Sequence, residues 1–386
     1  MKVLLLAGEE SGVLYARQIR AEVLRRNPSA EVRGYGDYGF EIGDLAVFGI
    51  WPVLRRIFYF LRVKRTMERA IDAWRPDVLC TVDYPGMNLK LAAYAKARGV
   101  RAVHVVCPQV WAWHQGRIPR IERSLDRLCC FLPFEPALFR PGFATFVGHP
   151  LVEEMRKGGY GVASAAAPAC LDAVRERTLA VLPGSRLGEI DKHLPTLLTA
   201  VAEIRRRLPS LRVIVPAANG RAYRRILSFV SSSDGFSVTH GGAREALRAA
   251  DAAVVASGTA TFEAAIAGCP FVVVYRVGAL LAAILRRVLK GVRHVGLVNV
   301  VAEKAGVPCP MPELLQEDFT AARVREQLLP WLTDAAANAD ARQRLANTMS
   351  IMRTGDGAIG RIVDELASES GSADASARAP GKRNGR

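Results

Sequence analysis

The sequence predicts an α/β protein built from two doubly wound, Rossmann-like domains. Three observations carry this prediction. Short apolar runs alternate with helical patterns along the chain, several of the runs are apolar at every residue, and the pattern restarts after a stretch rich in small residues. A length of 386 residues also exceeds what one hydrophobic core usually serves, which favours two domains.

Eight segments are predicted strands because each is a short apolar run bounded by turn residues. Runs that are apolar throughout are typical of strands buried on both faces, as in parallel sheets. Helical patterns of roughly ten to twenty residues separate many of them, which is the β-α-β order of an open parallel sheet. The predicted strands are Val3–Leu6, Val78–Val82, Ala102–Val106, Leu128–Leu132, Thr178–Leu182, Val213–Val215, Ala252–Ala256 and Phe271–Tyr275.

The stretch KGGYGVASAAAPACL, between Arg156 and Asp172, is the predicted linker because it is rich in glycine, alanine and serine. We therefore expect a first domain over residues 1–157 and a second over 158–352. A C-terminal helix is expected over 353–367, and a disordered tail over 368–386, where apolar periodicity is lost.

Lysine and arginine exceed aspartate and glutamate by 53 to 37, which gives a net charge of +16. This balance favours anionic partners: nucleic acid, phosphorylated small molecules or an anionic membrane surface. Nucleic acid is not predicted, because the basic residues are dispersed and no recognition motif accompanies them.

The seven cysteines include no C-x-x-C pair, and none of the six histidines stands at metal-ligand spacing with a cysteine. The sequence therefore predicts a reduced, cytosolic protein without structural zinc. No metal and no other cofactor are expected. The apolar start, Val3 to Ala7, is too short for an export signal and is followed at once by acidic residues. No run reaches the roughly 18 apolar residues of a spanning helix.

Ligands of open α/β sheets bind beyond the carboxyl ends of the strands, so residues directly after strands are the candidates. Asp83 follows the predicted strand Val78–Val82 and precedes a Pro-Gly turn, with Asn88 placed to cap the next helix. Its carboxylate could act as a general base on a substrate hydroxyl, or simply accept hydrogen bonds from turn amides.

Two tryptophans, Trp111 and Trp113, alternate around Ala112 in a proline-interrupted loop. They resemble an aromatic platform for a sugar ring or an acyl chain. Arg117, Arg120 and Arg123 follow at intervals of three and could line one helix face, with a solvated basic face as the alternative.

In LPGSRLGEI, the turn of Gly184 and Ser185 presents Arg186 at the start of a helix. Backbone amides at such a position favour an anion, and an arginine can hold a phosphate through two parallel hydrogen bonds. The alternative is an ordinary turn with an exposed arginine. Ser185 does not lie in a G-x-S-x-G nucleophile motif.

Ser257, Gly258 and Thr259 follow another buried strand and open a helix, with Glu263 one helical turn further on. The helix start suits a diphosphate, and a carboxylate at this place can accept hydrogen bonds from ribose hydroxyls. The pattern predicts a nucleotide-sugar site without a P-loop lysine. There is no Asp-x-Asp pair, so a divalent metal is not predicted there.

Two stretches suggest a lipid surface. In the segment Phe48–Arg65, which contains Trp51, we expect a helix from Pro52 with Leu54, Ile57, Phe58 and Leu61 as its core stripe. Tyr59 and Val63 would point the other way together with Arg55 and Arg62, an apolar excess on a basic face that is typical of interfacial helices. The second stretch, ALLAAILRRVLKGVRHV, shows a similar pattern, and a core helix with a solvated basic face is the alternative for both.

Nine motifs occur in order along the chain: GEESG, PQVWAWHQGR, FLPFEPALF, FVGHPL, LPGSRLGEI, ASGTATFEAA, PFVVVYR, LVNVVAE and PELLQEDFT. Together they resemble the lipid-A-disaccharide synthase family of bacterial glycosyltransferases, up to about residue 365. The resemblance implies the GT-B fold, in which two Rossmann-like domains face a central cleft.

The resemblance also implies roles for residues. Asp83 aligns with the catalytic aspartate of the family, and Arg186 matches an essential arginine that holds the donor diphosphate. The implied donor site on the second domain comprises Gly184, Ser185, Arg186, Ser257, Gly258, Thr259, Glu263, Asn299, Gln316 and Glu317. The implied acceptor and lipid side on the first domain comprises Gly8, Ser11, Gly12, Asn88, Trp111, Trp113 and Arg117.

The implied reaction joins UDP-2,3-diacylglucosamine to 2,3-diacylglucosamine 1-phosphate, with inversion, to give a β-1,6-linked disaccharide 1-phosphate and UDP. The implied location is the inner face of the cytoplasmic membrane, whose anionic surface would be contacted by Trp51, Arg55, Phe58, Tyr59 and Arg62. A homodimer is also compatible with the resemblance.

The chain departs from the family pattern at three positions. Val13 stands where the family carries an aspartate, and Gly86 and Met87 replace an Asp-Phe pair. Three other hypotheses therefore stay open: a related lipid-sugar transferase of the GT-B fold, a UDP-N-acetylglucosamine 2-epimerase, and a membrane-bound nucleotide-sugar-binding protein that has lost turnover.

Overall fold

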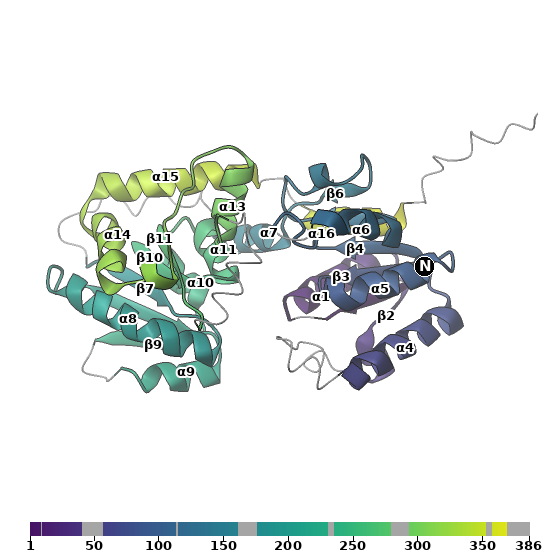
Figure 1. Ribbon diagram of the computed structural model, residues 1–386, viewed down its shortest axis with the longest axis horizontal. Helices are drawn as coiled ribbons and strands as arrows, with labels where there is room; N and C mark the ends of the chain where they lie inside the picture. The colour runs from purple at the N-terminus through teal and green to yellow at the C-terminus, as the bar shows by residue number, and fades with distance from the viewer. Residues whose placement is uncertain are drawn as a thin grey trace, which may run out of the picture. The chain divides into compact units, whose positions relative to one another are not determined.

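The computed structural model describes residues 1–8, 10–40, 57–112, 115–160, 176–230, 235–278, 293–352 and 357–368. The chain divides into two compact units (Figure 1). Unit 1 comprises Met1–Gly148 and Asp356–Arg386, and unit 2 comprises His149–Gly355. Both units are α/β, which confirms the predicted fold class.

Unit 1 contains a six-stranded parallel sheet in the order β2-β1-β3-β4-β5-β6. Its strands are β1 (Lys2–Ala7), β2 (Glu31–Arg33), β3 (Val78–Val82), β4 (Arg101–Val105), β5 (Arg127–Cys130) and β6 (Ala144–Phe146). The strand order reverses between β1 and β3, so the loops that follow these two strands flank a topological switch point, where ligands of such sheets bind.

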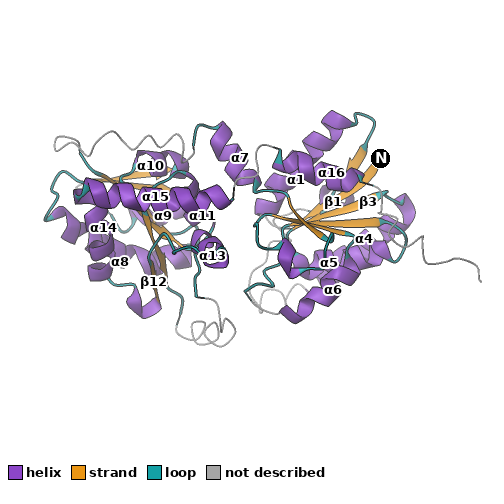
Figure 2. Cartoon of the chain, turned by 90° about the horizontal axis from the view of Figure 1, so that it is seen from above, coloured by secondary structure: helices purple, strands orange, loops and turns teal. Residues whose placement is uncertain are grey.

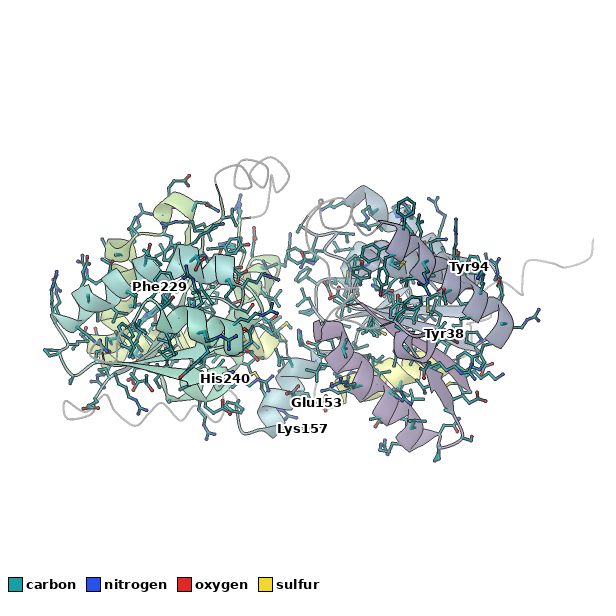
Figure 3. The ribbon with its side chains drawn as sticks, turned by 90° about the horizontal axis from the view of Figure 1, so that it is seen from below. Tyr38, Tyr94, Glu153, Lys157, Phe229 and His240 are labelled. Atoms are coloured by element: carbon teal, nitrogen blue, oxygen red, sulfur yellow. The ribbon has the colours of Figure 1, made fainter. Side chains whose placement is uncertain are left out.

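Helices cover both faces of the unit 1 sheet (Figure 2). One core, which includes Ile19, Val23 and Ile362, packs α1 (Glu10–Arg26) and α16 (Ala358–Ala367) on one face. The other core packs α4 (Ile57–Trp74), α5 (Pro85–Lys96) and α6 (Ile118–Ser124). Tyr94 lies on α5 (Figure 3). Its hydroxyl donates a hydrogen bond of 2.7 Å to Asp72 on α4. Short 3-10 turns are η1 (Tyr35–Tyr38), η2 (Gln115–Arg117) and η3 (Pro136–Leu138).

Unit 2 contains a second six-stranded parallel sheet, in the order β12-β11-β10-β7-β8-β9. Its strands are β7 (Thr178–Leu182), β8 (Arg212–Ala217), β9 (Phe236–His240), β10 (Ala252–Ala256), β11 (Phe271–Tyr275) and β12 (Glu313–Leu315). Counted within the unit, this is the 3-2-1-4-5-6 order of dinucleotide-binding folds, with the switch point between β7 and β10.

Helices cover the sheet of unit 2 as well (Figure 1). Among the described residues, one helix precedes its first strand, five run between successive strands and two follow its last strand. These helices are α7 (Pro150–Lys157), α8 (Leu187–Arg205), α9 (Gly220–Leu227), α10 (Ala243–Ala249), α11 (Thr259–Ile266), α13 (Leu297–Lys304), α14 (Ala321–Thr333) and α15 (Ala335–Ile351), with a 3-10 turn η5 (Gln316–Asp318). None of the helices in the described ranges is long and apolar enough to cross a membrane.

All eight predicted strands are present, with ends shifted by a few residues at most. The sequence does not predict β2, β6, β9 and β12, which are the four edge strands of the two sheets. Their side chains are largely half-buried or exposed, as in the EVR of β2 and the FSVTH of β9. An edge strand of this kind has no continuous apolar run to reveal it.

The domain boundary differs from the expected one. The division falls between Gly148 and His149, so α7 belongs to unit 2 instead of ending the first domain. The C-terminal helix α16 belongs to unit 1, where it packs on α1. The start of the predicted linker is described, with Lys157 ending α7, and Ser368 of the predicted tail is the C-cap of α16. The rest of the linker, 161–171, and of the tail, 369–386, lies outside the described residues.

The orientation predicted for the Phe48–Arg65 helix is wrong. Val63, expected on the outer face, is fully buried, and Tyr59 packs against the same core. Phe58 and Leu61, expected in the core, are 83% and 43% exposed. The inward stripe continues through Met67 and Ile71, beyond the segment from which the prediction was made. Trp51 and Arg55 lie outside the described residues, as does most of the second lipid-surface stretch, 279–292.

Candidate active site

Asp83 stands at the carboxyl end of β3, directly before α5. Asp83 and Tyr84 both adopt left-handed backbone conformations, with φ of 52° and 50°. Such values are uncommon for residues other than glycine, above all for a bulky tyrosine, and they concentrate at functional sites. The carboxylate Oδ1 of Asp83 accepts the backbone N–H of Tyr84 at 2.8 Å.

The side chain of Asn88 holds the Asp83 turn in place. Its side-chain amide donates to the carbonyl of Asp83 at 2.7 Å, and its Oδ1 accepts the hydroxyl of Tyr35 at 3.2 Å. Asn88 is fully buried. The structure thus places it as a support of the turn, and the N-cap of α5 is Tyr84 instead of Asn88. The place of Asn88 on the acceptor side stays a prediction.

Gly8 and Gly12 pack close to the same turn. A Cβ on Gly8 would lie 2.6 Å from the ring of Tyr84, and a Cβ on Gly12 would lie 3.3 Å from the carbonyl of Val82. The glycines after β1 therefore allow two strand ends to approach at the switch point, since no larger residue fits at Gly8. Ser11 lies in the first turn of α1.

Burial raises the pKa of the Asp83 carboxyl, and the hydrogen bond from the Tyr84 amide lowers it by a smaller amount. The group remains half-exposed. A carboxylate that is partly desolvated yet reachable is a better proton acceptor than a fully solvated one. The arrangement supports both sequence hypotheses, because Asp83 accepts a turn amide and still presents a carboxylate.

The tryptophan loop follows β4. Val106 begins it with φ of 75°, a genuine outlier for a β-branched residue. The indole N–H of Trp111 donates to Oε1 of Glu135 at 3.3 Å, and its ring packs edge-on against Phe134. Trp111 is therefore anchored, with its half-exposed ring left for contact. Trp113 lies outside the described residues, and Arg117 is half-exposed in η2.

One group of possible metal ligands occurs within the described parts of the chain, formed by Cys107, Cys130 and Glu135. All three are buried, and their ligand atoms lie within 4.8 Å of one another. Desolvation raises the pKa of Glu135 to about 8. The hydrogen bond with Cys107, together with burial, raises the pKa of Cys130. The hydrogen bond with Cys130 lowers the pKa of Cys107, but burial and the nearby Glu135 outweigh it and raise that pKa. The three groups are hence mainly protonated at neutral pH and serve as a hydrogen-bonded support for Trp111.

In unit 2, the turn after β7 differs from expectation in one respect. The backbone amides of Ser185 and Arg186, expected to face an anion, donate to Oε2 of Glu189 at 3.2 and 3.3 Å. The Arg186 guanidinium also pairs with Glu189, at 2.7 Å. Gly184, at φ of 121°, leaves no room for a Cβ beside this carboxylate. Glu189, which the sequence motif did not single out, occupies the place predicted for an anion.

The turn after β10 leads into α11, with Gly258 as the N-cap and Thr259 as the first helical residue. Gly258 and Thr259 are exposed, and Ser257 is half-buried. The carboxylate of Glu263 accepts a hydrogen bond of 2.9 Å from Arg244, which also pairs with Glu154 at 2.8 Å. Arg244 was missed because only the fold brings α10 beside α11.

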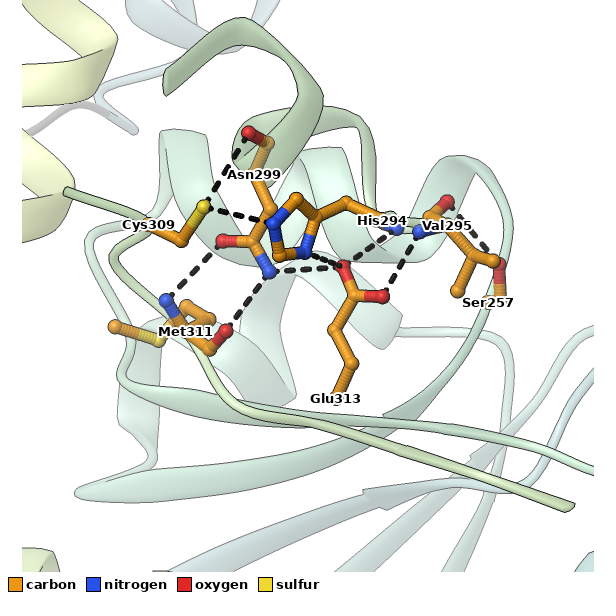
Figure 4. Close-up of polar contacts among 8 residues, drawn as sticks. Ser257, His294, Val295, Asn299, Cys309, Met311 and Glu313 are labelled. Atoms are coloured by element: carbon orange, nitrogen blue, oxygen red, sulfur yellow. Dashed lines mark hydrogen bonds and ion pairs between the residues drawn. The ribbon is translucent and has the colours of Figure 1, made fainter. Parts of the chain in front are cut away.

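Asn299 forms part of a buried cluster around Glu313 (Figure 4). Its amide donates to Oε1 of Glu313 and to the Met311 carbonyl, both at 2.8 Å, and its Oδ1 accepts the Met311 N–H at 3.2 Å. Glu313 also accepts the backbone amides of Val295 and Gly296. Asn299 thus holds the start of α13, and its place in the donor site stays a prediction.

The cluster continues to the protein surface. Nε2 of His294 lies 3.1 Å from the Sγ of Cys309, and its Nδ1 lies 3.7 Å from Glu313. The hydroxyl of Ser257 donates to the carbonyl of Val295 at 3.4 Å. Ser257 is thereby tied to the segment that Glu313 anchors, so the turn after β10 and the start of α13 are positioned together.

His193 and Arg276 link two other strand ends. Nδ1 of His193 lies 2.8 Å from the carbonyl of Pro183, and its Nε2 accepts the backbone N–H of Arg276 at 3.0 Å. Burial lowers the pKa of His193, which keeps the ring neutral. The Arg276 guanidinium donates to the carbonyl of Gln316, a residue held at φ of 51°. Glu317 follows, exposed, in η5.

The sequence-predicted donor residues of unit 2 thus gather at one edge of its sheet. Arg186 follows β7 and Ser257 follows β10, the neighbouring strands that flank the switch point. Gln316 and Glu317 follow the edge strand β12. Helix starts, exposed glycine and arginine at such an edge are typical of a phosphate-binding site.

Comparison with known proteins identifies the chain's relatives. Residues 3–354 match the family described as lipid-A-disaccharide synthetase. The chain is 35% identical to the lipid-A-disaccharide synthase of Chromohalobacter salexigens, with 92% of this chain and 94% of the relative covered. It is 36% identical to the Myxococcus xanthus enzyme, with 92% and 96% covered.

The chain belongs to the lipid-A-disaccharide synthase family. It is therefore a member of a glycosyltransferase family that makes lipid A disaccharide, and the family implies a nucleotide sugar and a lipid-linked sugar as substrates. Membership confirms the resemblance drawn from the motifs.

Solved structures with the same fold include enzymes of other activities. The UDP-N-acetylglucosamine 2-epimerase of Neisseria meningitidis aligns with a TM-score of 0.58 at 10% identity, covering 95% of this chain and 99% of that one. The calicheamicin glycosyltransferase CalG4 aligns with a TM-score of 0.54 at 15% identity, covering 95% and 97%. At such identities these likenesses establish the two-domain GT-B fold alone.

Proposed function

We propose that this member of the synthase family transfers 2,3-diacylglucosamine from UDP to the 6-hydroxyl of 2,3-diacylglucosamine 1-phosphate. The products would be the β-1,6-linked disaccharide 1-phosphate and UDP. The observation that carries the proposal is the Asp83 carboxylate, held at the switch point of unit 1 in a left-handed turn with a raised pKa.

In the proposed mechanism, Asp83 takes the proton of the acceptor 6-hydroxyl. The oxygen then forms a bond to the donor anomeric carbon while the bond from that carbon to the diphosphate oxygen breaks. One direct displacement of an α-linked donor gives a β-linked product, so the reaction inverts. A desolvated carboxylate suits this role, because burial makes it a stronger base.

On the donor side, UDP would leave with its negative charge neutralised by Arg186 and by the first-turn amides of α11. The Arg186 side chain is 63% exposed and pairs with Glu189. The diphosphate would therefore compete with the Glu189 carboxylate for the guanidinium. Glu263 would accept from the ribose hydroxyls, with Arg244 holding its carboxylate in place.

We further propose that unit 1 attaches to an anionic membrane, at the inner face of the cytoplasmic membrane, through the outer face of α4. Phe58 and Leu61 are exposed there, and Arg62 and Arg65 are exposed within the same two turns. Apolar side chains next to cationic ones are typical of interfacial helices. Tyr59, which packs inward, takes no part in this contact.

The test incubates the purified protein with UDP-2,3-diacylglucosamine and 2,3-diacylglucosamine 1-phosphate, and quantifies lipid and UDP by mass spectrometry. We expect disaccharide 1-phosphate and UDP in equal amounts. The variant Asp83→Asn should lose about 10²- to 10⁴-fold in rate, the usual contribution of a general base. Asp72→Asn on α4, an exposed carboxylate 48% accessible to solvent, serves as the control.

Two results would overturn the proposal. One is the absence of disaccharide with the natural sequence. The other is conversion of UDP-N-acetylglucosamine to its 2-epimer by the same preparation, which would assign the chain to the epimerase chemistry instead.

A further inference from the structure

A cavity of unit 1 lies beside the candidate acceptor side. It has a volume of about 260 Å³ and opens between α1, the carboxyl end of β2 and the turn η1. Val13, Ala16, Arg17 and Arg20 line it from one face of α1, at the spacing of successive helical turns. Arg33 and the backbone of Gly34 close the opposite side.

The cavity carries an excess of positive charge. Arg17 and Arg20 are exposed, and neither forms an ion pair or side-chain hydrogen bond with any residue the structure describes. Arg33 stacks on Trp74, with its guanidinium carbon 4.5 Å from the ring centre. The one acidic residue in the lining, Asp37, accepts the N–H of Gly34 at 2.6 Å. Two guanidinium groups are thus left to receive an anion.

The floor of the cavity is apolar and includes Leu5, Ala7 and Val13. Val13 is the position where the family pattern carries an aspartate. An aspartate there would stand four residues before Arg17, at the spacing that favours an ion pair on a helix. The valine removes that internal partner and leaves Arg17 uncompensated. A cationic rim over an apolar floor fits an amphiphilic anion.

A chain of two hydrogen bonds joins the cavity to the candidate base. Tyr35, which lines the cavity, donates its hydroxyl to Asn88 at 3.2 Å. Asn88 in turn donates to the carbonyl of Asp83 at 2.7 Å. A ligand held in the cavity therefore lies beside the residues that position the Asp83 turn.

We propose that this cavity binds the phosphate monoester of the acylated sugar acceptor, with Arg17 and Arg20 as its cationic ligands. This inference rests on the proposed function and adds to it the site that recognises the acceptor phosphate. Arginine suits the role because its planar fork of N–H donors matches the oxygens of a phosphate. The acceptor 6-hydroxyl, at the other end of the same sugar, would then be free to approach Asp83.

The experiment varies the two arginines and the acceptor phosphate independently. The full chain, Arg17→Gln/Arg20→Gln, Val13→Asp and the control Arg25→Gln are assayed with 2,3-diacylglucosamine 1-phosphate and with the same lipid lacking the phosphate. Arg25 lies on the same helix, outside the cavity, and pairs with Glu22.

We expect the double variant to raise the KM for the phosphorylated acceptor about ten- to a hundredfold, the usual effect of charge-assisted hydrogen bonds. The KM for the lipid without phosphate and the KM for the donor should stay within about twofold of the parent, because the arginines would have no partner in those cases. Val13→Asp should act in the same direction, and Arg25→Gln should match the parent.

The two proposals fail in different ways. If the parent makes disaccharide and the double variant keeps the parent KM for the phosphorylated acceptor, the cavity assignment falls and the proposed function stands. If the parent makes none, the proposed function falls, and equilibrium binding of the phosphorylated acceptor to parent and double variant still tests the cavity. Loss of binding to anionic phospholipid vesicles with an unchanged acceptor KM would assign the arginines to membrane headgroups and overturn the inference.

Discussion

Backbone strain is concentrated at the carboxyl edge of the unit 1 sheet. Asp83, Tyr84 and Val106 all adopt positive φ values, and they follow the neighbouring strands β3 and β4. Each such residue costs about 1–3 kcal/mol and persists only where its surroundings fix it. The buried amide of Asn88 supplies that support for Asp83. The carboxylate is hence preorganised, because the strain is already present before a substrate binds.

The raised pKa of Asp83 predicts the acid limb of the pH–rate profile. A general base works only when ionised, so kcat/KM should fall as the pH drops through the pKa of this carboxyl in the free enzyme. Because burial raises that pKa above the ordinary 3.8, activity should be lost at a higher pH than for a solvated aspartate. The measurement is kcat/KM against pH for the parent chain.

A second variant, Asn88→Ala, tests the support of the turn without altering the carboxylate itself. We expect a lower kcat, because the Asp83 turn would relax toward solvent. The acid limb should also move to lower pH, because the pKa of Asp83 is raised by burial. An acid limb at or below the ordinary value in the parent, or the same limb in Asp83→Asn, would assign it to another group.

The position of a candidate residue could be predicted from the sequence where that residue comes directly after a strand. Asp83, Arg186 and Ser257 stand where strand ends put them. The contacts of a side chain could not be predicted where they depend on a residue that only the fold brings close. Glu189 and Arg244 gain their roles from contacts with the Arg186 turn and with Glu263. The sequence likewise does not reveal that the side chain of Asn299 donates hydrogen bonds to Glu313 and Met311.

At the scale of elements, α4 illustrates how a helical pattern can be assigned to the wrong face. Both faces of the segment are apolar near its start, so its first turns do not decide between them. Val63, Met67 and Ile71 settle the direction, because together they form one stripe at helical spacing and all three are buried. Because this stripe faces the core, Phe58 points outward and is 83% exposed.

The exposed pair on α4 predicts membrane affinity. Phe58→Ser/Leu61→Ser should weaken binding to vesicles of anionic phospholipid by at least about tenfold, because each apolar side chain that enters the interface contributes about a kcal/mol or more. Cosedimentation with vesicles measures the affinity. Both residues are exposed, so the melting temperature should change little.

Leu227→Ser is the matched control, since Leu227 is also 43% exposed but lies on α9 of unit 2. Equal losses for the control and the α4 variant would show general surface adsorption. Unchanged binding of the α4 variant would remove α4 from the membrane contact.

At the scale of the whole molecule, the two units share a plan. Each has a parallel sheet with a switch point, and each puts its candidate residues on the loops beside that point. The alternation of strands and helices makes this plan predictable from sequence. The division at Gly148 was not predictable, because helix α7 continues the β-α pattern of the first unit while packing in the second.

The last described helix, α16, returns to unit 1 and completes one of its cores. Ile362 is fully buried there, and α16 packs on α1, β4 and β5. Asp364 pairs with Arg26 of α1 at 2.5 Å, and Arg361 donates to the Val147 carbonyl at 2.9 Å. The core of unit 1 is therefore completed by residues that follow the whole of unit 2 in the sequence.

Ile362→Ala should consequently destabilise unit 1 by about 2–5 kcal/mol, the usual cost of truncating a buried aliphatic side chain to alanine. Hydrogen–deuterium exchange should rise in α1, β4 and β5 and stay unchanged in the peptides of unit 2, because the two units have separate sheets and cores. Leu14→Ala, at a position 43% exposed on α1, should leave the exchange near that of the parent. Faster exchange confined to unit 2 would contradict the assignment of α16 to unit 1, whereas a rise shared by both units would mean that they unfold together.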